Sequence, residues 1–77
     1  DGNNPERDLE RQRRVEWVRT AIQALSPKHR TVVVLRLIDG YSTRETAQIL
    51  NVPQGTVMSR LARAMDFLES QLKEMEP

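Results

Sequence analysis

The sequence predicts a small all-α domain of four helices, with a helix-turn-helix in its C-terminal half. Apolar residues recur at helical spacing along most of the chain, and no segment carries a clear strand pattern. Ser-Pro, Ser-x-x-Glu and single glycine and asparagine residues stand where helices would start and stop. The 77 residues, 38% hydrophobic and 30% charged, have the size and composition of one globular domain with a modest core.

The first helix is predicted over residues 5–25, and residues 1–4 are predicted to be a disordered terminus or a linker remnant. Pro5 suits the first turn of a helix, because its missing N–H would have no partner there. Trp17 and Ala21 are expected beside a buried stripe at helical spacing, which consists of Val15, Val18, Ile22 and Leu25.

The second helix is predicted over residues 27–39. Ser26-Pro27 is a start signal, with serine as the N-cap and proline at the first helical position. The run from Val32 to Leu35 is rich in β-branched residues, so periodicity alone would also allow a strand. The Ser-Pro start, the length of the segment and Gly40 as a C-terminal cap favour the helix.

The third and fourth helices are predicted over residues 43–50 and 53–73, and together they form the helix-turn-helix. Ser42 and Glu45 have the spacing of a capping box at the start of the third helix. Asn51 suits the left-handed conformation of the turn that follows. The buried stripe of the fourth helix is expected at Val57, Leu61, Leu68 and Leu72.

The N-terminal part of the fourth helix is predicted to present a small, polar face. With Val57 pointing inward and about 100° of rotation per residue, Leu61, Ala64 and Leu68 also point inward. The residues that point outward are Gly55, Ser59, Ala62 and Asp66, and those at the edges of the face are Thr56, Met58 and Arg63. Small side chains let a helix approach base edges in the major groove, where hydroxyl and guanidinium groups bind bases or phosphates. Groups placed for such contacts are the side chains of Thr56, Ser59 and Arg63, the backbone N–H groups of residues 54–56, and Arg44 on the neighbouring helix. Arg60, nearer the core, fits a DNA contact and a structural salt bridge equally well.

Charge is unevenly distributed along the chain, although the net charge is only +1. Residues 28–63 hold six basic and two acidic side chains, a net of +4, whereas residues 64–77 carry a net of −3. The positive segment contains the predicted helix-turn-helix, which favours nucleic-acid binding. Taken alone, this charge distribution fits a mixed, solvated surface that binds no ligand equally well.

Several other classes of function have no support in the sequence. There is no cysteine, and His29 is the single histidine, so a metal site is not expected. No cofactor motif or nucleophile constellation indicates an enzyme. No run is long enough to span a membrane, no signal peptide is visible, and a cytoplasmic protein needs no disulfides. The chain begins at Asp1 and not at methionine, which indicates part of a longer protein.

Three segments give the chain a resemblance to a known family over about residues 25–68. The segments are Leu25-Ser26-Pro27, Gly40-Tyr41-Ser42 with Glu45, and Gly55-Thr56-Val57 with Ser59-Arg60-Leu61. The chain resembles region 4, the C-terminal DNA-binding domain, of the extracytoplasmic-function (ECF) sigma factors of the sigma-70 family. The resemblance implies a helix-turn-helix domain of the winged-helix-like or sigma region 4 type.

The resemblance also implies a role in bacterial transcription initiation, in the cytoplasm and without a cofactor. Domains of this family bind the minus-35 promoter element through the recognition helix, dock on the β flap of RNA polymerase, and are usual targets of anti-sigma factors. With the family's contact positions included, the candidate DNA-binding residues are Thr43, Arg44, Gln54, Thr56, Met58, Ser59, Arg60, Ala62 and Arg63. Met58 stands at a position that is often basic in the family, and Met65 interrupts a common Arg-Ala-Arg ending, which implies fewer phosphate contacts.

Two other functions fit parts of the sequence. A response-regulator output domain also uses a four-helix unit of this kind, but would be joined to a phosphoacceptor domain and not to a polymerase-binding domain. A sigma-like protein-interaction module without DNA binding fits Met58 and the acidic C-terminal tail. The presence of Ser59, Arg60 and Arg63 argues against that module.

Overall fold

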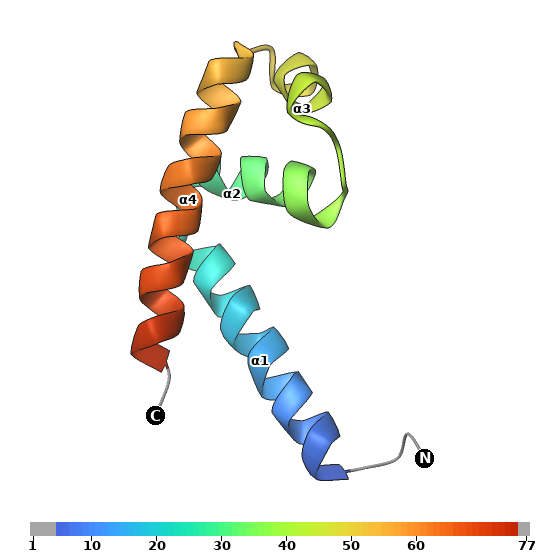
Figure 1. The fold of residues 1–77 in the computed structure, drawn as a ribbon, viewed down its shortest axis with the longest axis vertical. Helices are drawn as coiled ribbons and strands as arrows, with labels where there is room; N and C mark the ends of the chain where they lie inside the picture. Colours follow the sequence, from blue (N-terminus) through green and yellow to red (C-terminus); the bar gives the residue numbers. More distant parts are fainter. Residues whose placement is uncertain (1–4, 76–77) are drawn as a thin grey trace.

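Four α-helices and one π-helical segment follow one another in the computed structural model, which describes residues 5–75 (Figure 1). The elements are α1 (Pro5–Ala24), α2 (Pro27–Val33), η1 (Val34–Ile38), α3 (Thr43–Leu50) and α4 (Gln54–Met75). No strand occurs within residues 5–75, which confirms the all-α prediction for that part of the chain. Segment 1–4, predicted to be disordered, lies outside the described residues. Within the described part, none of the helices has the length and apolar character needed to cross a bilayer.

Local signals in the sequence set both ends of α3. At its start, the Ser42 hydroxyl accepts a hydrogen bond from the Glu45 N–H at 3.0 Å. The Glu45 carboxylate in turn accepts one from the Ser42 N–H at 2.9 Å, which completes the predicted capping box. At its end, Asn51 adopts the predicted left-handed conformation, with φ 56° and ψ 49°. These two caps fix the length of α3 and lead the chain into α4.

The second helix begins as predicted but ends differently. Ser26 has the extended conformation of an N-cap, although its side chain makes no capping hydrogen bond. From Val34 the helix widens to the π form, with the Asp39 N–H bonded to the Val34 carbonyl at 2.8 Å. The strand alternative is therefore wrong, and the single helix predicted over 27–39 consists of two joined segments. Gly40 follows with φ 81°, the positive value that suits glycine after a helix.

Helix α4 is the central element of the fold, because it packs against α1, α2 and α3. The buried residues form two clusters, one of Ala21, Leu25, Val33, Ala64 and Leu68 and the other of Val32, Ala47 and Val57. Leu61 packs against both clusters. Val57, Ala64 and Leu68 lie on the inward side of α4, as their spacing predicted. The core therefore determines which side of α4 faces solvent.

The predicted buried stripe of α1 is wrong at two of its positions. Val15 and Val18 are 48% and 42% exposed, whereas Leu25 is 3% exposed. Figure 1 shows the reason, because α1 diverges from α4 towards its own N-terminus and only its C-terminal end reaches the core. Ala21, which was expected beside the stripe, is fully buried at that end.

Candidate nucleic-acid interface

The outward face of α4 has the character that the helix projection predicted. Between residues 55 and 63, its exposed residues are Gly55, Met58, Ser59, Ala62 and Arg63. Val57, on the other side of the helix, is fully buried. The Ser59 hydroxyl donates a hydrogen bond to the Thr56 carbonyl at 3.2 Å. Its oxygen remains able to accept a hydrogen bond, such as one from the amino group of adenine or cytosine. The side chains of Gly55, Ser59 and Ala62 are small enough for the helix to approach base edges closely.

The N-terminus of α4 offers fewer free backbone N–H groups than predicted. The N–H groups of Thr56 and Val57 both donate to the Pro53 carbonyl, at 3.0 and 3.3 Å. Those of Gln54 and Gly55 have no partner among residues 5–75, and they lie at the positive end of the helix dipole. A phosphate at this end would therefore be bound by two N–H groups, and the N–H of Thr56 is not one of them.

A hollow between α3 and the start of α4 brings together two candidates from different helices. Arg44 and Gln54 both line it, and its volume is about 300 Å³. Arg44 is exposed and forms no ion pair with any carboxylate in the described part of the chain, so its charge is available to a phosphate. Thr43 precedes it as the first residue of α3 and is half-buried.

Arg60 lies apart from the small face, on a flank of α4. It is half-buried, and it lines a hollow with Pro27, Lys28, Thr31 and Leu50. None of the carboxylates that the structure describes forms an ion pair with Arg60, so the structural salt bridge considered for it is absent there. Lys28 is exposed at the same hollow. It was not among the candidate DNA-binding residues, because nothing in the sequence except its charge indicated such a role. The two cations form a second positive site beside α4.

Two of the six basic residues in segment 28–63 have structural roles. The Arg30 guanidinium donates to three carbonyls at the end of α1, those of Ile22 at 3.4 Å, Gln23 at 2.9 Å and Leu25 at 2.9 Å. The Arg36 guanidinium donates to the Tyr41 carbonyl after η1. The cations of this segment that have no partner within residues 5–75 are Lys28, Arg44, Arg60 and Arg63. The net charge of the segment therefore overstates the positive charge that DNA would meet.

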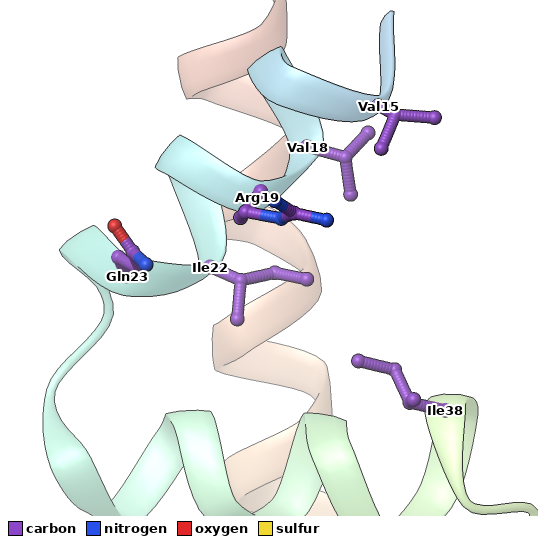
Figure 2. Close-up of a pocket in the computed structure, with 6 residues that line it drawn as sticks. All are labelled: Val15, Val18, Arg19, Ile22, Gln23 and Ile38. Carbon is purple, nitrogen blue, oxygen red and sulfur yellow. The ribbon is translucent and has the colours of Figure 1, made fainter. Parts of the chain in front are cut away.

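A second exposed surface is apolar and lies between α1, η1 and α4. Figure 2 shows Val15, Val18 and Ile22 of α1 beside the open space that Ile38 of η1 borders. An adjoining hollow of about 470 Å³ extends to Met65 of α4. None of the candidate DNA-binding residues lines either hollow. Exposed apolar patches of this kind are typical of surfaces that contact other proteins.

Comparison with known families and proteins agrees with the resemblance seen in the sequence. The family model described as Sigma-70, region 4 matches residues 15–68. The chain is 41% identical over 58 residues to the ECF RNA polymerase sigma factor SigW of Bacillus subtilis, with 75% of this chain and 31% of that protein covered. It is 47% identical over 53 residues to the RNA polymerase sigma-E factor of Streptomyces antibioticus, with 69% and 29% covered. It is 33% identical over 75 residues to the RNA polymerase sigma-H factor of Pseudomonas aeruginosa, with 97% and 39% covered.

The matched segment 15–68 contains every candidate DNA-binding residue. The chain spans about a third of the length of these curated relatives, all of which are named as RNA polymerase sigma factors. The response-regulator alternative has no support among these matches. Because the family model covers more than half of the sequence, the chain belongs to the sigma-70 region 4 family, and it is of the ECF type that its sequence resembles.

Proposed function

We propose that the chain is the promoter-reading domain of an alternative sigma factor, which binds the minus-35 element and directs RNA polymerase to initiate transcription. The observation that carries this proposal is the outward face of α4, which is exposed, small and uninvolved in core packing. The family assignment supports the same role. The proposal contains no catalytic step, and it places the protein in the bacterial cytoplasm with the polymerase.

In this proposal α4 lies in the major groove and reads base edges with its outward face. Ser59 accepts a hydrogen bond from a base amino group, and Arg63 donates to guanine or to a phosphate. Ala62 allows the helix to approach closely because it adds only a methyl group. The backbone N–H groups of Gln54 and Gly55 bind a phosphate at the start of the helix.

The unpartnered cations neutralise further phosphates around the groove. Arg44 reaches the backbone from α3, and Lys28 and Arg60 reach it from the flank of α4. With Arg63 included, about four phosphates are neutralised, so the logarithm of the binding constant should fall with the logarithm of salt concentration at a slope of roughly −3 to −4. If Arg30 and Arg36 also bound phosphates, the slope would be roughly −5.

We also propose that the domain binds the RNA polymerase core through the β flap and is held by an anti-sigma factor when inactive. Both partners are implied by the family resemblance. Support for a protein partner is the apolar surface between α1, η1 and α4, which lies outside the proposed DNA face. Binding of the 77-residue chain to purified core polymerase, with and without the flap, tests the first partner. Equal binding to both would remove the flap from the proposal.

The test of DNA reading is a salt-dependent titration of the chain against a pool of short duplexes, with sequencing of the bound fraction. We expect an enriched motif, and we expect Arg63→Ala to lose it without a lower melting temperature, because Arg63 is exposed. Arg19→Ala is the matched control, since it removes one positive charge from an exposed position on α1. Failure to enrich any motif at low salt, or equal loss with Arg19→Ala, would contradict sequence reading by α4.

A further inference from the structure

Met58 is an apolar side chain that the fold itself does not use. It is 62% exposed, and it belongs to neither buried cluster. A single exposed methionine is ordinary on a protein surface, so its exposure alone carries no function. Its position does, because Met58 stands on the edge of the face that also carries Ser59 and Ala62.

The surroundings of Met58 on α4 are small and open. Ala62 lies one turn further along the helix and about 40° away around it, so the two side chains are neighbours. Gly55 lies one turn earlier, and a Cβ built there would meet no atom within 4 Å apart from its chain neighbours and the local helix backbone. Met58 and Ala62 are both exposed and therefore form an apolar strip that another molecule can reach.

The chemistry of the major groove leaves one natural partner for this strip. Guanine, adenine and cytosine present hydrogen-bonding groups there, and a methionine side chain has no donor and only a weakly accepting sulfur with which to read them. Thymine also presents a C5-methyl group, which is read by apolar contact. A flexible, polarizable thioether adapts well to such a methyl group.

We propose that Met58, with the Ala62 methyl beside it, recognises the C5-methyl group of a thymine in the bound promoter element. This inference rests on the proposed function, since it requires the outward face of α4 to lie in the major groove. It adds a base identity to that site. Arg63 stands on the opposite edge of the face, so its contact is separate from the thymine contact.

The test uses the motif enriched by the 77-residue chain and replaces each of its thymines in turn by deoxyuridine, which pairs identically but lacks the methyl group. We expect one replacement to weaken wild-type binding about threefold to fivefold, as for the loss of one buried methyl group. Met58→Ala should bind the thymine duplex more weakly by a similar factor and should show no further loss with deoxyuridine at that position. Because Met58 is exposed, circular dichroism should show an unchanged fold for this variant.

Met65→Ala is the matched control. Met65 is 46% exposed and lies on nearly the same side of α4, seven residues and about 10 Å further from the N-terminus. This variant should keep the full response to deoxyuridine. A wild-type chain that binds every deoxyuridine duplex equally well, a motif without thymine, or a Met58→Ala chain that still responds would each overturn the inference while leaving promoter recognition intact. A pool with no enriched motif would overturn both.

Discussion

Arg30→Ala should destabilise the domain without changing how folded molecules bind DNA. The Arg30 guanidinium satisfies three carbonyls at the end of α1, where a helix has no internal donors left. The bond to Leu25 is short and partly buried, the bond to Gln23 is short but exposed, and the bond to Ile22 is long. Counting one full charged hydrogen bond and two weakened ones, the loss is about 2–4 kcal/mol.

That loss is a large part of the free energy of unfolding, which for a chain of this length is about 4–12 kcal/mol. The melting temperature should fall by about 8–32 °C. Thermal and urea denaturation followed by circular dichroism would measure the change. Arg30→Lys should lose most of the same stability, because an ammonium group cannot reproduce the planar fork that reaches three carbonyls.

Lys28→Ala is the control for charge, since it removes the same positive charge from an exposed site on the same helix. It should leave the melting temperature nearly unchanged and weaken DNA binding. A fall of less than about 4 °C for Arg30→Ala, which corresponds to less than 1 kcal/mol, would refute the structural role. Full rescue by Arg30→Lys would show that only the charge matters.

Three further predictions concern the core and the caps. Leu61→Ala should cost about 2–5 kcal/mol in urea denaturation, because Leu61 packs against both clusters, and a loss well below this range would mean that the clusters close over the gap. Thr46→Val should raise stability by about 1 kcal/mol, since the Thr46 hydroxyl is fully buried with no hydrogen-bond partner in the described part of the chain, and a lower melting temperature would contradict this. The backbone N–H and the hydroxyl of Ser42 lower the pKa of Glu45 below its ordinary 4.5. The wild-type protein should therefore be more stable than Glu45→Gln above pH 4.5, and this difference in stability should vanish as the pH falls through the lowered pKa. If the melting temperatures of the two proteins differed by the same amount from neutral to strongly acidic pH, this prediction would be contradicted.

The features that the sequence predicted correctly are those that depend on neighbouring residues. The capping box of Ser42 and Glu45 and the left-handed Asn51 follow from spacing and backbone preference within one turn. The inward stripe of α4 could be predicted because the helix crosses all the others and so needs a continuous apolar side. Val15 and Val18 follow the same periodic pattern but remain exposed, because the direction in which α1 leaves the core is set by tertiary packing. The periodicity within one helix carries no information on that direction.

The candidate site divides in the same way. The exposed face of α4 follows from its helical phase alone, so Ser59, Ala62 and Arg63 could be placed from the sequence. The partners of the basic residues could not, because they lie in other elements, whose position relative to the basic residue is set by tertiary packing. Arg30 bonds to carbonyls five to eight residues earlier, across the break between α1 and α2. Lys28 and Arg60 share a hollow although 32 positions separate them.

The separation of the two sides of α4 also has an evolutionary consequence. Gly55, Met58, Ser59 and Ala62 belong to neither buried cluster, whereas Val57, Ala64 and Leu68 hold the helix in place. Substitutions at exposed positions of this kind usually change stability by no more than about 0.5 kcal/mol. If α4 reads promoter DNA as proposed, one copy can therefore acquire a new target sequence after gene duplication, through a few surface mutations that preserve its folding. A single architecture can in this way serve many regulons, each with its own promoters.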